Sequence, residues 1–478
     1  MNWRSHRRLL LRTLVAAILL VVISLLTRVL STPSSLEYDL FDSDQYSGQV
    51  TTNPAAHDDY GAHVPSLKSD GTQQKMEQEK EEVIIKPIPY DLNEVPEQMR
   101  TKVTSYVRAI LDPYDSTFTG LRCPRVKTKR YGHLQAPLGE NSRMYFFALD
   151  LRQVVDLLPR LMGSIVEAMR FLGPENCALS IIEGNSDDGT WEVLSALKPK
   201  LESLGVLSFV LKEQIDPSKD DRIGNLARLR SLALEPLRNS RNSTARSLGL
   251  IGSTSKFTDD AVVVFLNDVA ACPEDILELL HQRILQAADM TCAMDWHHPG
   301  GKNGKPYFYD VWISRALSGD LFFDIPTSGS WDYAETLFPF DPEASQRFAH
   351  HRPFQVFACW NGAVTFTAKP ILDGKIDFRQ LYEGECFQGE PNTFCKDMWF
   401  HGYGRIAVVP SVNLEYTDER GAWIKEERGF VYQWAAEEED EVEGAPPLKI
   451  DWKGPPDKVK CMPEFQRQNW VPWNESLV

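Results

Sequence analysis

An acidic residue follows directly after one of the most apolar runs of the chain. The run AVVVFL at residues 261–266 continues into Asn267-Asp268-Val269. A carboxylate at the end of a buried strand is a suitable ligand for Mg²⁺ or Mn²⁺, since these ions prefer oxygen and keep waters and substrate phosphate oxygens in their other positions. We therefore expect Asp268 to be the principal metal ligand. The alternative is an Asx-turn in which Asp268 only ends the strand.

A second polar segment, EGNSDDGT at residues 183–190, follows the apolar run CALSII. Acids and amides at a turn between a strand and a helix can bind a ribose or a base edge, and glycines let the backbone approach a ligand. The same residue types also form turns and helix caps, so a purely structural role is the alternative. The candidate donor-binding residues of this segment are Glu183, Asn185, Asp187 and Asp188.

Three arginines lie in the segment 222–237, whose pattern predicts a helix: Arg222, Arg228 and Arg230. Guanidinium groups match the geometry of phosphate oxygens, so these residues are candidates for binding a diphosphate. Solvated arginines that pair with nearby acids such as Glu235 are the alternative.

Polar-aromatic clusters occur in the later part of the chain, around Trp312, Trp360 and Trp399. The faces of tryptophan rings bind sugar rings, although several of these side chains must also fill the core. We take these three residues as candidate acceptor-binding positions.

Five short apolar runs alternate with amphipathic segments between residues 144 and 294. The runs are MYFFAL, CALSII, VLSFVL, AVVVFL and DMTCAM, and the segments span residues 153–171, 190–204, 222–237 and 273–287. Apolar strands separated by helical segments indicate a mainly parallel α/β sheet with helices on both faces. In such sheets ligands bind beyond the carboxyl ends of the strands, which is where the polar segments above fall.

Residues 9–30 form an apolar stretch in which Arg12 and Arg28 are the only charges. About 20 such residues can span a bilayer, and the arginines before them favour a cytoplasmic N-terminus. We expect a cytoplasmic tail at residues 1–8, a transmembrane signal anchor at 9–30 and a disordered stem at 31–90, which is rich in Ser, Thr, Asp, Gln and Gly. A cleaved signal peptide is the alternative, but Arg28 and the lack of an Ala-x-Ala site argue against it.

The chain has 51 Lys and Arg against 67 Asp and Glu, a net charge of −16, which argues against nucleic acid as a partner. All eight cysteines lie beyond the predicted anchor, and none forms the CxxC pair typical of zinc sites. In a secretory lumen they could pair, with Cys386 and Cys395 the nearest in sequence, or they could be buried thiols. Two sequons, at Asn242 and Asn474, would be glycosylated only in the same compartment.

Several strings together resemble glycosyltransferase family 69, the fungal capsule-type α-1,3-mannosyltransferases, over about residues 90–430. They are FFALDL, SIIEGNSDDGT, RLRSLALEPL, VVVFLNDV, ADMTCAMDW, FYDVWISRALSGD, CWNGA, CKDMW and GYGRIAVVPSVNLEY. The resemblance implies a GT-A-like domain, which we place at residues 91–435. It also implies a type II Golgi membrane protein that uses GDP-mannose and Mn²⁺ or Mg²⁺, and retention at the anomeric carbon. The tail at residues 436–478 is acidic and then Pro-rich with interspersed Trp, which predicts an irregular C-terminal wrap.

The resemblance also implies roles for individual residues. Asn267 and Asp268 fall at the metal-binding acidic motif, and residues 183–188 fall where the nucleoside binds. The loop Trp360-Asn361-Gly362 falls near donor and acceptor, and Glu390 is the acid that follows it. The acids expected to orient donor or acceptor hydroxyls are Asp295, Asp310, Glu390 and Asp397.

The chain departs from the family pattern at two places. It has Arg230-Ser231 where the family has Arg-Asn, and Gly389-Glu390-Pro391 where the family has Ser-Glu-Cys. His401 is the candidate for a late metal ligand. We therefore expect a metal-dependent mannosyl transfer to a glycan hydroxyl. The alternatives are a non-catalytic Golgi scaffold for capsule or cell-wall polysaccharide assembly and a transferase that uses a UDP-sugar.

Overall fold

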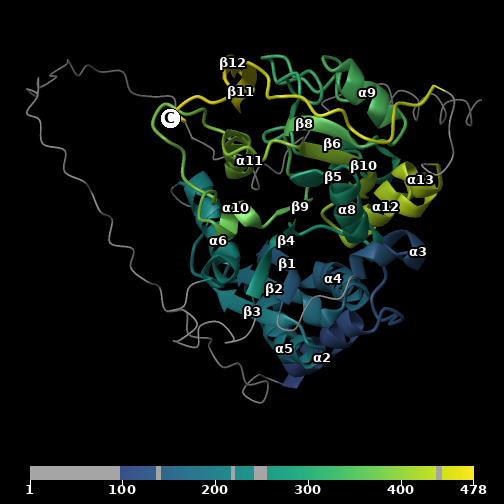
Figure 1. Cartoon of the computed structure of the whole chain (residues 1–478). Helices are drawn as coiled ribbons and strands as arrows, with labels where there is room; N and C mark the ends of the chain where they lie inside the picture. The colour runs from purple at the N-terminus through teal and green to yellow at the C-terminus, as the bar shows by residue number, and fades with distance from the viewer. Residues whose placement is uncertain (1–96, 136–141, 217–220, 242–255, 438–443, 478) are drawn as a thin grey trace, which may run out of the picture. The chain divides into compact units, whose positions relative to one another are not determined.

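The computed structural model describes residues 97–135, 142–216, 221–241, 256–437 and 444–477 (Figure 1). The predicted tail, anchor and stem lie outside the described residues, as does the sequon at Asn242. Within these ranges no helix is both long enough and apolar enough to cross a membrane.

The centre of the fold is a ten-stranded sheet in the order β3-β2-β1-β4-β9-β5-β10-β8-β7, with β6 paired to β5. Its strands are β1 (Ser142–Leu151), β2 (Cys177–Glu183), β3 (Leu207–Lys212), β4 (Lys256–Leu266), β5 (Met290–His297), β6 (Tyr307–Phe308), β7 (Arg315–Ala316), β8 (Phe354–Ala358), β9 (Ala363–Thr367) and β10 (Ile406–Leu414). All five strands predicted from the apolar runs are present, as β1 to β5. The pairs among β1, β2, β3 and β4 are parallel, so a mainly parallel sheet is confirmed.

Two strands inside the sheet, β9 and β8, run against this direction. β9 pairs antiparallel with both β4 and β5, and β5 pairs parallel with β10. The carboxyl ends of β1, β2, β4, β5 and β10 therefore share one edge of the sheet, and β9 begins at that edge. The residues just before β9 are consequently placed beside the residues that follow β4.

Helices cover both faces of the sheet, as predicted. α2 (Glu97–Leu111), α4 (Leu158–Leu172), α5 (Thr190–Ser203) and α8 (Pro273–Leu285) pack on one face, with α12 (Asp418–Arg428) and α13 (Val431–Glu437) beside β10. α6 (Arg222–Asn239), α10 (Lys369–Leu372) and α11 (Glu390–Phe400) pack on the other face (Figure 1). The remaining helices are α3 (Thr128–Tyr131) and α9 (Pro342–Ala349), with 3₁₀ helices at Gly132–Gln135, Val155–Leu157, Pro174–Asn176 and Gly301–Asn303.

Alternate residues of the strands build two apolar layers. Phe146 and Phe265 point into the layer under α6, whereas Phe147 and Val264 point into the layer under α4 and α8. This alternation explains why the strands read as continuous apolar runs, because both faces of each strand are buried.

The C-terminal segment is more regular than the sequence suggested. An irregular wrap was predicted for residues 436–478, but β11 (Lys458–Glu464) and β12 (Arg467–Pro472) form an antiparallel hairpin. A disulfide joins Cys461 in this hairpin to Cys386. Two more disulfides join Cys123 to Cys272 and Cys292 to Cys359, whereas Cys177 and Cys395 are buried and belong to no disulfide. The nearest cysteines in sequence, Cys386 and Cys395, are thus not paired.

Candidate active site

Acidic residues gather at the carboxyl edge of the sheet. Asp150 lies one residue before the end of β1, Glu183 ends β2, and Asp268 follows β4 by two residues. Asp295 lies near the end of β5. Because these strand ends share one edge, the acids that the sequence spreads over more than a hundred positions converge in space.

Asp150 and Asp268 form one part of this cluster. Burial raises the pKa of Asp150 to about 7; the charge of Arg230 opposes this rise, and the charges of Glu390 and Asp268 add to it. Burial also raises the pKa of Asp268 to about 6. Two dehydrated carboxyls within electrostatic reach of each other favour a shared positive partner, since neither is stable as an isolated charge. Asp150 was not predicted, although it follows the apolar run MYFFAL by the same rule that singled out Asp268.

Arg230 supplies a positive charge at the centre of the cluster. Its buried guanidinium forms an ion pair with Glu390, the first residue of α11, and lies 5.1 Å from the centroid of the Trp360 ring. The charge of Arg230 opposes the rise in pKa that burial causes at four carboxyl groups: Asp150, Asp268, Asp310 and Glu390.

Asp295 and Asp310 form a second carboxyl pair. Asp295 is fully buried, and its Oδ2 accepts a hydrogen bond of 2.5 Å from the hydroxyl of Tyr416, whereas its Oδ1 accepts none. Burial, together with the charge of Asp310, raises the pKa of Asp295 well above its ordinary value. Burial also raises the pKa of Asp310, against the backbone hydrogen bond from Asn361 and the charge of Arg230. The hydroxyl of Tyr309 is close to the same acids, because the charges of Asp295 and Asp310 both raise its pKa beyond the effect of burial.

The loop before β9 joins the two carboxyl pairs. The backbone N–H of Asn361 donates to Asp310 Oδ2 at 2.9 Å, and the Trp360 indole N–H donates to Asn267 Oδ1 at 3.0 Å. Asn361 and Gly362 have φ values of 53° and 78°, and a Cβ on Gly362 would lie 2.8 Å from Val269. Glycine is therefore required at this turn. The structure places the predicted loop beside both carboxyl pairs, and the Trp360 ring is buried there rather than open to solvent.

The segment 183–188 has a mixed character. Asp188 accepts hydrogen bonds from the backbone N–H groups of Val155 and Thr190, so its carboxylate organises the turn. Glu183 accepts a bond from the Ser186 N–H through Oε1, but its buried Oε2 accepts none. Asn185 and Asp187 are exposed. Asp188 thus fits the structural alternative, while Glu183, Asn185 and Asp187 remain candidate donor contacts.

The other predicted arginines differ in position. Arg222, at the start of α6, lies near the cluster, because its charge acts on the pKa values of Glu390 and Tyr309. Arg228 is exposed on the same helix. Of the three candidates, Arg230 and Arg222 are brought to the site.

Three predicted site residues lie elsewhere. Trp312 stacks on Phe465 with ring centroids 4.6 Å apart, and Trp399 donates its indole N–H to the Phe357 carbonyl. Asp397 accepts two hydrogen bonds from Arg379, at 2.7 and 2.9 Å.

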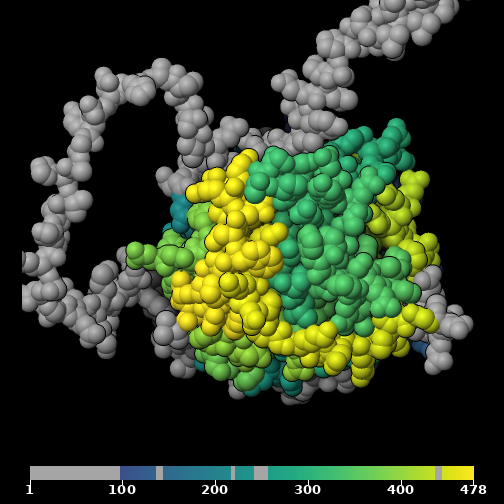
Figure 2. Space-filling model, turned by 90° about the horizontal axis from the view of Figure 1, so that it is seen from above, coloured from purple at the N-terminus to yellow at the C-terminus, as the bar shows by residue number. Residues whose placement is uncertain are grey.

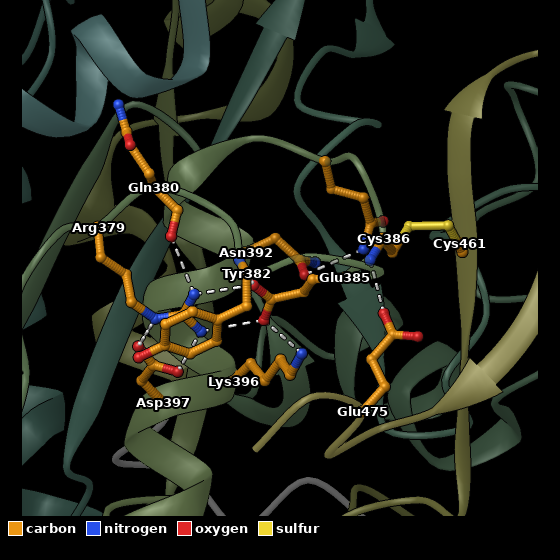
Figure 3. Close-up of polar contacts among 11 residues, drawn as sticks. Arg379, Gln380, Tyr382, Glu385, Cys386, Asn392, Lys396, Asp397, Cys461 and Glu475 are labelled. Atoms are coloured by element: carbon orange, nitrogen blue, oxygen red, sulfur yellow. Dashed lines mark hydrogen bonds and ion pairs between the residues drawn. A yellow bond between two sulfur atoms is a disulfide. The ribbon is translucent and has the colours of Figure 1, made fainter. Parts of the chain in front are cut away.

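Figure 3 shows the network around Asp397. Arg379 lies between Asp397 and Glu385, and Lys396 pairs with Glu385. The next residue, Cys386, carries the disulfide to the C-terminal hairpin. This network fixes the segment that leads to Glu390.

A histidine that the sequence analysis did not select lies close to the edge. His298 is buried, and its Nδ1 lies 3.1 Å from Oε1 of Glu415, the residue that follows β10. The backbone of Glu415 accepts from Ala270, two residues after Asp268. His401, the predicted candidate, is exposed at the end of α11. Since Glu415 becomes a neighbour of this loop only through the β5–β10 pairing, no local signal marks His298.

Within the described residues, no group of three or more His, Cys, Asp or Glu side chains is placed to hold a metal ion. The cluster nevertheless suits a hard cation, because it holds several dehydrated carboxylates around one guanidinium. A magnesium-like ion needs only one or two protein carboxylates when substrate phosphates and waters complete its shell.

Comparison with known proteins shows similarity to one family and to individual proteins. The sequence matches the family described as cryptococcal mannosyltransferase 1 over residues 144–397. It is 34% identical over 375 residues to the α-1,3-mannosyltransferase CMT1 of Cryptococcus neoformans var. neoformans serotype D, covering 73% of this chain and 75% of that protein. A crystal structure of GalNAc-T7 with UDP, GalNAc and Mn²⁺ is similar with a TM-score of 0.35 and 15% identity, covering 58% of this chain but only 44% of the other.

Proposed function

The chain belongs to the cryptococcal mannosyltransferase 1 family, and on that premise we propose that it transfers a mannosyl residue from GDP-mannose to a hydroxyl of a glycan. Membership confirms the resemblance identified in the sequence. We propose further that the new bond is α-1,3 and that the anomeric configuration is retained, in line with the name of the cryptococcal relative.

The observation that carries the proposal is the buried Arg230, held by Glu390 among the acids of the strand ends. Departure of a nucleoside diphosphate leaves negative charge on the phosphate and positive charge on the sugar. Arg230 would stabilise the phosphate, and the surrounding carboxylates would stabilise the sugar. Because Arg230 and these carboxylates are already in place, they need not rearrange when the charges develop in the reaction.

Asp268, with Asp150 within electrostatic reach, would hold a divalent cation against the donor phosphates. When bound, such an ion would offset the charge that develops on the leaving diphosphate. The cluster holds more carboxyl groups than the single charge of Arg230 can neutralise, which supports this assignment. Asp295 and Asp310 would orient hydroxyls of the sugar or acceptor, and we assign no protein nucleophile.

We propose a type II location in the Golgi membrane, with the described residues in the lumen. Three disulfides and an exposed sequon at Asn474 support an oxidising, glycosylating compartment. Glycosylation at Asn474 together with an intact N-terminus on the purified protein would support the anchor, whereas cleavage near Ser31 would contradict it.

The test is a donor screen with the purified full-length chain. Hydrolysis of GDP-mannose and of several UDP-sugars is measured with and without Mn²⁺, and the anomeric configuration of a transferred product is read by NMR. We expect GDP-mannose to be used and Arg230→Met to lose most of this activity, while Arg228→Met on the exposed side of the same helix retains it. Folded protein that uses none of the donors would favour the scaffold alternative, and preference for a UDP-sugar would correct the donor.

A further inference from the structure

A cavity of about 340 Å³ lies between α9, the start of β8 and the segment at residues 453–456. Its lining includes Ser318, Phe340, Asp341, Glu343, Arg347 and Lys453. This volume falls within the range of small-molecule and sugar sites, which begins at about 300 Å³. None of these residues belongs to the acid cluster.

Two exposed aromatic rings lie beside this cavity. Phe340 in its lining is 48% exposed, and Trp470 of β12 is 45% exposed. The ammonium group of Lys460 lies 6.0 Å from the Phe340 ring centroid and 5.6 Å from that of Trp470, so the two rings flank one lysine. Rings held in this way and left open to solvent can stack on the apolar face of a sugar.

The backbone around these rings is closely packed. Gly319 has a φ of 83°, and a Cβ at this position would meet the Lys458 carbonyl and lie 3.2 Å from the Trp470 ring. The Lys460 N–H donates to the Gly319 carbonyl at 2.8 Å. Figure 2 shows the yellow C-terminal segment lying against the green segment that contains residues 300–350. The hairpin therefore holds Trp470 at a fixed place beside the cavity.

The charges in the cavity wall balance. Asp341 and Glu343 face Arg347 and Lys453, and Glu343 is ion-paired with Lys453. Arg347 donates to the carbonyls of Pro353 and Leu448. A wall without net charge does not favour a phosphate or an acidic peptide, whereas paired carboxylates and cations still offer hydrogen bonds to hydroxyls.

We propose that Phe340, Trp470 and this cavity form a second glycan-binding site, which takes a neutral segment of a polysaccharide acceptor. The proposal rests on the proposed glycosyl transfer and names the acceptor as a polymer rather than a short sugar.

The proposed second site lies apart from the acid cluster. Gln355, in the cavity wall, pairs with Ala407 near the start of β10, whereas the acid cluster lies near the other end of that strand, at Leu414. The partners of Ala407 and Leu414 on β5, Thr291 and Asp295, are four residues apart, which corresponds to about 13 Å of extended strand. A polymer bound at both places gains affinity because the second contact is intramolecular, and a short acceptor gains none.

The test measures binding of a mannan polysaccharide and of mannobiose to the purified full-length chain by calorimetry, without any donor. We expect Trp470→Ala and Phe340→Ala each to weaken mannan binding about tenfold, and Trp470→Phe to restore most of it. Tyr114→Ala, which removes another exposed ring, should bind as the wild type does. In transfer assays the KM for mannan should rise in Trp470→Ala while the KM for mannobiose changes less than about twofold.

Binding without donor separates this proposal from the proposed function. Mannan binding that is equal in wild type, Trp470→Ala and Phe340→Ala, or absent from all three, overturns the second site even if the enzyme hydrolyses its donor. Loss of binding in both variants, with unchanged thermal unfolding, supports the site even if every donor in the screen fails.

Discussion

The guanidinium of Arg230 is ion-paired with Glu390 across the gap between α6 and α11, in a site closed from solvent. Glu390 is the acid retained where the chain departs from the family pattern, as Gly389-Glu390-Pro391. The sequence alone suggested that it contacts the acceptor. In the structure it is ion-paired with Arg230, which we propose stabilises the donor phosphate, and this relationship makes its role testable.

Glu390→Gln should lower donor hydrolysis and transfer by the same factor. The variant leaves the buried guanidinium of Arg230 without its charge partner, and such breaks typically cost about 3–5 kcal/mol. If Glu390 acts through Arg230 on the leaving diphosphate, both reactions lose the same stabilisation. The measurement compares the two rates in one preparation, with Glu390→Asp as the conservative control. A loss of transfer much larger than that of hydrolysis would restore the acceptor role.

The raised pKa values of Asp150 and Asp268 predict how stability depends on pH. Both lie above the usual value of about 4, so the folded protein binds these protons more tightly than the unfolded chain. Their contribution is fully present below about pH 4 and is lost as the pH rises through about 6 to 7. In EDTA, Asp150→Asn should therefore raise the Tm by about 2–4 °C at pH 8 and by nothing at pH 4.

Metal binding should offset the free-energy cost of ionising Asp150 and Asp268 in the folded protein. At pH 7.5 added Mn²⁺ should raise the Tm of the wild type, because a ligand that binds only the folded state stabilises it. Asp268→Asn should lose this gain. The same gain in Asp268→Asn as in the wild type would remove Asp268 from the metal site.

Local patterns predicted the first half of the sheet well. The runs MYFFAL to DMTCAM became β1 to β5, because most of these strands are buried on both faces and an amphipathic helix separates each strand from the next. β9 was not predicted as an antiparallel insertion between β4 and β5, since nothing in its own five residues sets its direction. The hairpin β11–β12 was missed for a similar reason, because Pro and Trp in that segment hid its pairing.

The site was predictable where chemistry follows a strand and less so where it depends on pairing. Asp268 was selected because it comes near the end of an apolar run, whereas Asp295 was selected as one of the acids expected to orient donor or acceptor hydroxyls. Asp150 also follows an apolar run, MYFFAL, but it was not among the predicted site residues. His298 and Tyr416 meet the site only through the pairing of β5 with β10, so a local reading could not have found them.

Asp397→Asn should affect stability rather than chemistry. Its carboxylate is ion-paired with Arg379, and Arg379 is also ion-paired with Glu385. Removing one of the two acids should cost about 1–3 kcal/mol of unfolding free energy, measured in urea. Glu385→Gln, in the same network, should give a similar loss, and both variants should hydrolyse donor at the wild-type rate per folded molecule. A large loss of rate in Asp397→Asn alone would return this residue to the catalytic candidates.

Asp295 should work as a neutral carboxyl group. It is fully buried, and among the described residues no Lys or Arg forms an ion pair with it; Oδ2 accepts a hydrogen bond from the Tyr416 hydroxyl. Burial and the nearby Asp310 raise the pKa of Asp295 well above its ordinary value, which favours the protonated form of this carboxyl group. A neutral carboxyl of this kind donates a hydrogen bond, and an amide of the same shape can do the same.

Asp295→Asn should therefore keep donor hydrolysis within about fivefold of the wild type, whereas Asp295→Ala, which removes the donor and leaves a cavity, should lose at least about a hundredfold. Asp310→Asn is the matched comparison, because Asp310 carries the negative charge of the pair next to the Arg230 charge. It should lose far more activity than Asp295→Asn. The assay is the pH profile of GDP-mannose hydrolysis for all three variants, each normalised to its folded fraction. An Asp295→Asn variant as inactive as Asp295→Ala would show that Asp295 acts in its ionised form, as a base or as a partner for positive charge on the sugar.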